Sequence, residues 1–378
     1  MHVKSILLVA VASALLLLVV AGASANGTLT PQEELGKALF FDQNLSANSN
    51  QSCATCHASE VGWTGPVEFI NAHGAVYEGS IPGEFGDRKP PTAAYGGESP
   101  TLYYDTRAGT WVGGMFWDGR ATGSTLGDPL AEQALGPFLN PKEQALASPA
   151  DVINIVKAST YADLFAAQCP GSDTVALYNC IGRAIAAYER SSEVSPFTSK
   201  YDYWLKGQAK LTAEEQLGRA LFQGKAKCSA CHVNKGKRPL FTDFSYDNLG
   251  IPKNPENPAT IANPAWADPG LGGFLMSAGS VESVYMAAWG KHKVPTLRNV
   301  DKRASEGFVK AYGHNGYFKS LLDIVHFYNT RDVPGAGWPA PEVAINVNTA
   351  EMGNLGLSPR EEAAIVAFMK TLTDGWRP

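Results

Sequence analysis

The chain has 378 residues, 44% of them hydrophobic, and a formal net charge of -5. This length predicts two domains, with enough apolar residues for two cores. The acidic balance gives no basic footprint of the kind that a phosphate backbone requires, so nucleic acid is not an expected partner.

The first 25 residues predict a secretory signal peptide. A lysine precedes an apolar stretch over residues 6–20, which ends in a small-residue triplet at residues 23–25. The stretch is too short to span a bilayer comfortably, and no cysteine follows to carry a lipid. We therefore expect cleavage before Asn26 and a soluble protein, periplasmic or secreted, with no membrane span.

Residues 29–41 (LTPQEELGKALFF) and 211–223 (LTAEEQLGRALFQ) form an internal repeat. In each copy a threonine stands three residues before a glutamate, as Thr30 before Glu33 and Thr212 before Glu215. This capping-box pattern, followed by apolar residues at helical spacing, predicts a helix start. The chain therefore contains two copies of one structural unit.

A C-x-x-C-H motif follows each repeat helix, formed by Cys53, Cys56 and His57 in the first copy and by Cys228, Cys231 and His232 in the second. Two thiols about one helical turn apart suit the two vinyl groups of a porphyrin, and the adjoining imidazole can reach the iron. Paired halves of a zinc site usually lie much closer in sequence, and a thioredoxin-like pair expects a strand, helix and strand around a single motif. We therefore expect two covalently bound haem c groups.

The two remaining cysteines, Cys169 and Cys180, flank a short loop before a helix, and we expect a local, structural disulfide between them. A final helix should open at Ser358 and Glu361, and strand signals are sparse. The predicted fold is mainly α, with two cytochrome-c-like helical domains related by the repeat, each with one covalent c-type haem. Residues 26–202 would form the N-terminal haem domain and residues 203–378 the C-terminal one.

Further motifs occur in a definite order along the chain. They are Phe116-Trp117-Asp118-Gly119-Arg120-Ala121, Glu132-Gln133-Ala134, Gly136-Pro137, Asn140-Pro141-x-Glu143, Lys293-Val294-Pro295-Thr296-Leu297-Arg298-Asn299 and His314-Asn315-Gly316. With the haem motifs, they resemble the landmarks of the bacterial dihaem cytochrome c peroxidases and their MauG-like branch, over nearly all of the mature chain. The resemblance implies a haem that reacts with hydrogen peroxide in the N-terminal domain and an electron-transferring haem in the C-terminal domain.

The resemblance makes Glu143 the distal acid/base at the first haem, with Gln133 and Pro137 on the same face. A carboxylate there can move a proton from the inner to the outer peroxide oxygen. Pro137 stands four residues after Gln133, so both would share a helical face, and proline has no ligating atom. Apart from the resemblance, Asn140, Pro141 and Glu143 also fit the N-cap, N1 and N3 positions of a helix start.

The sixth ligand of the second haem distinguishes the two branches. At a fixed spacing after His314, where the peroxidases carry methionine, this chain has Tyr328, as the MauG-like branch does. A methionine ligand raises a haem potential, whereas a phenolate favours the oxidised iron. The alternative for Tyr328 is an aromatic core residue, and Met276 and Met352 are weaker ligand candidates.

Trp117 resembles the family's tryptophan between the two haems, where an oxidisable ring can relay electrons. A core aromatic is the alternative. His73 stands where the peroxidases have a histidine that blocks the first haem iron until reduction, so it is either a haem ligand or a surface histidine.

Two departures concern cofactor and partner. The family's Arg-Asn-x-Pro calcium segment is Arg88-Lys89-Pro90-Pro91 here, and because an ammonium cannot ligate a cation, the segment argues against calcium. Ala226 replaces a tryptophan that MauG uses to draw electrons from its partner, so that partner is not expected to be shared.

The leading hypothesis is a MauG-like enzyme that reacts with hydrogen peroxide and oxidises a protein partner by long-range electron transfer, with a copper-binding protein as one partner class. The alternative is a detoxifying cytochrome c peroxidase fed by a small cytochrome or cupredoxin, favoured by His73 and opposed by Tyr328. A non-enzymatic electron carrier would need both irons six-coordinate, which Glu143, Gln133 and Pro137 oppose. A positive docking face for an acidic partner is predicted from the cations around the second motif, which are Lys225, Lys227, Lys235, Lys237 and Arg238.

Overall fold

The computed structural model describes residues 27–377, so the signal peptide predicted for residues 1–25 lies outside the described part. The described chain is mainly helical. Its helices are α1 (Pro31–Phe41), α2 (Cys53–Cys56), α3 (Glu68–Ala72), α4 (Pro129–Leu139), α5 (Pro149–Lys157), α6 (Ala162–Gln168), α7 (Thr174–Arg190), α8 (Lys200–Leu205), α9 (Ala213–Gln223), α10 (Pro258–Ala262), α11 (Gly270–Ser277), α12 (Glu282–Ala287), α13 (Leu321–Thr330) and α14 (Pro359–Lys370). No helix in this range is long and apolar enough to cross a membrane.

Two small antiparallel sheets complete the described secondary structure, together with short 3-10 turns. Strand β1 (Tyr103–Asp105) pairs with β2 (Thr110–Val112), and β3 (Tyr246–Asp247) pairs with β4 (His292–Lys293). The first hairpin belongs to the N-terminal half, but Leu102 and Trp111 beside it pack on Tyr246 and Leu271 of the C-terminal half. The hairpin therefore helps to join the two halves.

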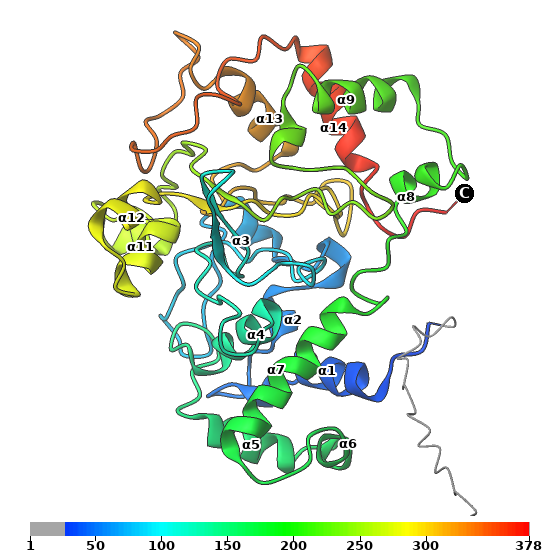
Figure 1. Ribbon diagram of the computed structural model, residues 1–378, viewed down its shortest axis with the longest axis vertical. Coiled ribbons are helices and arrows are strands. Elements are labelled where there is room, and N and C mark those ends of the chain that lie inside the picture. Colours follow the sequence, from blue (N-terminus) through cyan, green and yellow to red (C-terminus); the bar gives the residue numbers. More distant parts are fainter. Residues whose placement is uncertain (1–26, 378) are drawn as a thin grey trace, which may run out of the picture.

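Two hydrophobic cores organise the described chain. Buried residues between Leu35 and Val194 form one core, and those between Tyr201 and Leu372 form the other. In Figure 1 the helices α1 and α4 to α7 lie in the lower half, and α8, α9, α13 and α14 lie in the upper half. Long loops from both halves meet between them.

The repeat helices α1 and α9 start as predicted. In α1 the Thr30 hydroxyl accepts from the Glu33 N–H at 3.3 Å, and the Glu33 carboxylate accepts from the Thr30 N–H at 2.7 Å. Thr212 and Glu215 make the same pair of bonds at 3.2 and 2.7 Å in α9. Both capping boxes are therefore confirmed.

Each repeat helix also crosses a partner helix at a glycine. Gly36 of α1 lies on Ala184 of α7, where an added Cβ would stand 1.9 Å from the Ala184 carbonyl oxygen. Gly218 of α9 lies on Ala364 of α14, and the corresponding distance is 1.8 Å. Because no side chain fits at either crossing, the two helix pairs pack through backbone contact. The repeat is thus a repeat of packing as well as of sequence.

The disulfide predicted between Cys169 and Cys180 is confirmed. It joins the end of α6 to α7, and the two Cα atoms are 5.8 Å apart. Both residues belong to the N-terminal core or pack against it. The bond therefore closes a local loop and leaves the other four cysteines available.

Candidate functional site

The cysteines of the two C-x-x-C-H motifs, Cys53, Cys56, Cys228 and Cys231, form no disulfide within the described chain. Cys53 and Cys56 begin and end the single turn of α2, and Cys228 begins a 3-10 turn that Cys231 closes. Burial raises the pKa of Cys56 and that of Cys228 to about 12. The spacing within each pair is the one that addition to the two vinyl groups of a haem requires.

The histidines of the two motifs are oriented in the same way. Nδ1 of His57 lies 3.2 Å from the Trp63 carbonyl oxygen, and Nδ1 of His232 lies 2.9 Å from that of Phe241. A carbonyl oxygen only accepts, so Nδ1 carries the proton and Nε2 keeps its lone pair. Burial lowers the pKa of His57 to about 4 and also lowers that of His232. A neutral, oriented imidazole with a free Nε2 is what a haem iron requires.

A largely apolar cavity adjoins the second motif. Cys228, Cys231 and His232 line it, and α13 adds Ile324 and Tyr328. Tyr328 therefore lines the same cavity as the residues of the second motif, and its ligation of the second haem stays a prediction. Burial raises the pKa of its phenol, so a phenolate at this position requires a neighbouring cation.

The methionine candidates separate in space. Met352 is buried and lines the same cavity as Tyr328. Met276 lies on α11, is 48% exposed and does not line the cavity. Two candidates therefore remain for the second axial ligand, the phenol of Tyr328 and the thioether of Met352.

Glu143 acts electrostatically on the first motif, because its charge raises the pKa of the Cys56 thiol. Burial also raises the pKa of Glu143, as suits a carboxyl group that must hold and release a proton. Gln133 and Pro137 lie one turn apart on α4, which ends just before Glu143.

The segment that carries Glu143 is a turn, so the helix-start interpretation of Asn140, Pro141 and Glu143 is wrong. Helix α4 continues to Leu139, and Asn140 is its C-cap. The Glu143 N–H donates to the Asn140 carbonyl at 3.0 Å within the turn. The next helix begins only after Ser148, whose hydroxyl caps α5. The residues that resemble a helix start therefore form the C-terminal end of α4 and the turn after it.

Trp117 lies at the junction of the two halves. It is 9% exposed, its Nε1 donates to the Lys89 carbonyl at 2.8 Å, and its own carbonyl accepts from the Lys293 N–H at 2.8 Å. It also lines the cavity of the second motif, which extends to Gly62 and Thr64 in the loop after the first motif. The ring thus lies between the surroundings of the two motifs.

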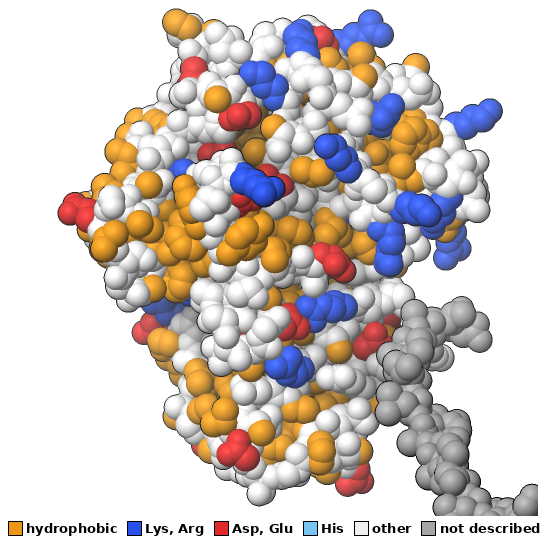
Figure 2. Space-filling view, viewed as in Figure 1, with side chains coloured by type: hydrophobic (Ala, Val, Ile, Leu, Met, Phe, Trp, Pro, Cys, Tyr) orange, Lys and Arg blue, Asp and Glu red, His pale blue; other side chains and the backbone are white. Residues whose placement is uncertain are grey.

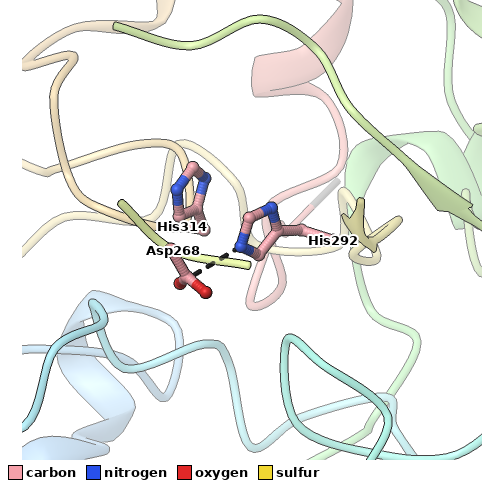
Figure 3. A group of neighbouring side chains, drawn as sticks. All are labelled: Asp268, His292 and His314. Atoms are coloured by element: carbon pink, nitrogen blue, oxygen red, sulfur yellow. Dashed lines mark ion pairs between the residues drawn. The ribbon is translucent and has the colours of Figure 1, made fainter. Parts of the chain in front are cut away.

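An ion-pair network crosses the same junction. Arg88 lies 2.6 Å from an Asp118 oxygen, and its guanidinium donates to both oxygens of Asp268 at 2.6 and 2.7 Å. Asp268 also lies 3.1 Å from His292, which stacks on His314 with ring centroids 3.7 Å apart (Figure 3). The carboxylate and the two rings are close enough to hold a metal ion. However, the Arg88 guanidinium already binds both oxygens of the Asp268 carboxylate, and its positive charge repels a metal ion.

His73 lies at the surface in this structure. It follows α3, its side chain is 49% exposed, and Nδ1 is 3.3 Å from a Glu256 oxygen. Its ring also meets that of Phe69 edge-on. Ligation of the first haem iron by His73 stays a prediction.

The segment that stands where the family has its calcium segment carries a buried lysine, Lys89. Lys89 is 8% exposed, and its Nζ donates to the Thr64 hydroxyl and to the Pro90 carbonyl, both at 2.9 Å. Calcium binds six to eight oxygen atoms, and lysine offers only donors. The residues present therefore do not fit a calcium ion.

The predicted docking cations divide into two groups. Lys225 pairs with Glu361 at 2.8 Å, Lys227 donates to the Ala350 carbonyl at 2.8 Å, and Arg238 stacks over a phenylalanine ring. Lys235 and Lys237 are exposed and make no hydrogen bond within the described chain. Figure 2 shows most of the visible Lys and Arg side chains over the half that contains α8, α9 and α14.

The two C-x-x-C pairs outside any disulfide and the two oriented imidazoles define a c-type cytochrome with two haem-attachment sites. A family model described as "Di-haem cytochrome c peroxidase" matches residues 30–210. The methylamine utilization protein MauG of Paracoccus denitrificans is 37% identical over 359 residues, covering 90% of this chain and 88% of that protein. The chain therefore belongs to the dihaem cytochrome c peroxidase and MauG family of haem oxidoreductases that act with peroxide.

Other relatives lie in both branches of the family. A cytochrome-c peroxidase of Denitromonas iodatirespirans is 28% identical over 358 residues, covering 90% of this chain and 80% of its own. The crystal structure of the diheme peroxidase BthA from Burkholderia thailandensis matches with a TM-score of 0.76 and 30% identity, over 92% of this chain and 87% of that one. A MauG-like protein associated with microbial copper homeostasis matches with a TM-score of 0.66 and 26% identity, over 92% and 91%.

Proposed function

We propose that the protein is a MauG-like periplasmic enzyme that reacts with hydrogen peroxide and oxidises a protein partner by long-range electron transfer. Two covalent haem c groups serve this function, one in residues 26–202 and one in residues 203–378. The observation that carries the proposal is the position of Tyr328, which lines the same apolar cavity as the residues of the second motif.

The first site reacts with peroxide. A haem bound here would supply an iron that can react with peroxide. His57 would hold that iron through its free Nε2, and Gln133 and Pro137 would line the pocket for peroxide. Glu143 accepts the proton of the inner peroxide oxygen and delivers it to the outer one, so that water leaves.

The second site stores oxidising power. Tyr328 would hold the second haem iron as a phenolate, which would favour the oxidised iron, as a retained oxidising equivalent requires. Trp117 lines the cavity of the second motif together with Gly62 and Thr64 from the loop after the first motif, and would offer an oxidisable ring on the route between the two sites. A copper-binding protein is the partner class that we favour, because one similar structure is that of a MauG-like protein associated with copper homeostasis.

A detoxifying peroxidase is the second candidate, with electrons supplied by a small cytochrome or cupredoxin. It is favoured by Met352, which lines the same cavity as Tyr328. Cytochrome-c peroxidases are also among the relatives that cover about as much of the chain as MauG does. A thioether ligand would raise the second haem's potential and suit it to collect electrons.

Two measurements on the ferric holoprotein distinguish the candidates. Electron paramagnetic resonance reports the ligands of each iron, and steady-state assays with reduced cytochrome c report peroxidase turnover. We expect a five-coordinate first iron, a tyrosine-ligated second iron and little turnover with cytochrome c. A methionine-ligated second iron together with rapid turnover would establish the detoxifying peroxidase instead.

A further inference from the structure

Lysine side chains of the C-terminal half reach backbone carbonyls of the N-terminal half at three places. Lys293 donates to Gly113, Lys310 to Val61, and Lys319 to both Asn71 and His73. Each also donates to at least one carbonyl of its own half. Within the described chain none of the three pairs with a carboxylate. The junction is therefore joined by cations that sit among neutral oxygen atoms.

Lys310 occupies the most enclosed of these positions. Lys310 is 4% exposed. Its Nζ donates to the carbonyls of Val61, Asn299 and Lys302 at 2.8, 2.9 and 3.0 Å. Burial lowers the pKa of Lys310. However, three acceptors at these distances need three N–H donors, and only the ammonium form has three. The arrangement is a cage of carbonyl oxygens closed around a positive charge.

Lys89 supplies a second cation next to this cage. Its Nζ donates to Thr64 and Pro90 in the loops around the first haem motif, and its charge lowers the pKa of Lys310. Both lysines line the cavity of the second motif, together with Trp117. Carbonyl and hydroxyl oxygens from several loops are also what a calcium ion collects in proteins.

We propose that Lys89 and Lys310 form a built-in cation site, which does the structural work of a bound calcium ion at the junction of the two halves. Lys310 holds the loop after the first haem motif against the loop that follows Lys293-Val294-Pro295-Thr296. Lys89 joins Thr64 to Pro90 within the N-terminal half beside it. A calcium ion at this place would meet two fixed positive charges in a buried setting, where like charges repel strongly. The protein is therefore independent of calcium for its folded junction.

The test begins with the wild-type holoprotein, purified with excess calcium or with excess chelator. Calcium content is measured by atomic emission, stability by the thermal unfolding midpoint, and the haem surroundings by the ferric electron paramagnetic resonance spectrum. We expect no stoichiometric calcium, and the same midpoint and spectrum in both preparations. A protein that holds about one calcium ion per chain, or whose spectrum or midpoint changes in chelator, overturns the proposal.

Variants test the lysines themselves. Lys310→Met and Lys89→Met remove the donors at similar length, and the exposed Lys235→Met is the matched control. Stranded buried carbonyls should lower the unfolding midpoint of each variant by roughly 3 to 10 °C relative to the control. Should Lys310→Met give no folded protein, Lys89→Met decides alone. Midpoints equal to that of the control in the variants that fold refute the built-in site.

Discussion

The indole Nε1 of Trp117 donates to the backbone carbonyl of Lys89 at 2.8 Å, so the proposed electron relay is bonded to the backbone of the residue whose side chain is a buried lysine. The backbone of Trp117 is held from the other half as well, by the Lys293 N–H. Bonds from both halves therefore fix the ring. Its distance to either haem site depends on the packing of the whole junction.

Haem attachment depends on the thiols of the two motifs. Cys53→Ser or Cys228→Ser removes one of the two thioether bonds at its site, so each variant should lose stable haem at that site and retain it at the other. Haem stain after denaturation and absorbance per protein measure this. A double Cys169→Ser and Cys180→Ser variant is the control, because it removes two cysteines outside the motifs and should keep both haems.

Glu143→Gln should slow the reaction with peroxide by roughly 100-fold to 10,000-fold, the usual cost of losing an acid/base group. Only the ionised carboxylate can take the peroxide proton, and burial raises its pKa. The wild-type rate should therefore fall as pH decreases through this raised pKa, and the variant should lack that fall. Stopped-flow spectra follow the reaction, with the exposed Glu34→Gln as control. Equal rates in all three proteins would contradict the assignment.

Tyr328→Met should raise the potential of the second haem and permit turnover with reduced cytochrome c, because a thioether stabilises ferrous iron relative to a phenolate. Spectroelectrochemical titration gives the potential. Met352→Leu is the informative comparison, since Met352 lines the same cavity. If Met352→Leu changes the spectrum of the second haem and Tyr328→Phe does not, Met352 is the ligand.

Glu189 should make stability depend on pH. Its carboxyl group on α7 is buried, Oε2 has no hydrogen-bond partner among residues 27–377, and burial raises its pKa to about 8. Between the two pKa values the native protein keeps this proton and the unfolded chain has lost it. The contribution of Glu189 to the free energy of unfolding is therefore complete below the unfolded pKa of about 4.3, and it is lost as pH rises through the native pKa. Glu189→Gln should become more stable relative to the wild type as pH rises toward 8. Parallel unfolding midpoints across this range would show that Glu189 is not the source.

The docking face should depend on Lys235 and Lys237, because Lys225 and Lys227 already have partners within the chain. Changing both to Glu should slow electron transfer with an acidic partner protein at low ionic strength, and salt should reduce the difference. The rate of the peroxide reaction serves as the control. Transfer that keeps its rate and salt dependence would place docking elsewhere.

Local patterns predicted the parts that depend on neighbouring residues. The capping boxes of α1, α9 and α14 and the Cys169–Cys180 disulfide all follow from short motifs. The start of a helix at Asn140 was wrong, because the packing of α4 extends that helix up to the same residue. The resemblance to a known family, rather than spacing, pointed to Glu143.

The lysine contacts at the junction had no sequence signal. The partners of Lys310 are backbone carbonyls, which every residue has, and they come together only when loops far apart in the chain meet. The same holds for the contact between Trp117 and Lys89, whose partner is again a carbonyl. Such contacts require the tertiary structure.

The glycine crossings at Gly36 and Gly218 bear on how the chain arose. In both copies of the repeat, the helix ahead of the haem motif packs on its partner helix through a backbone contact at a glycine. The surroundings of the two motifs differ, since Glu143 lies near one and Tyr328 near the other. Because no side chain fits at these crossings, substitution of either glycine is disfavoured, whereas the loops beyond the helices can change. After duplication, the helix crossings would thus have stayed the same while the residues around each haem motif diverged.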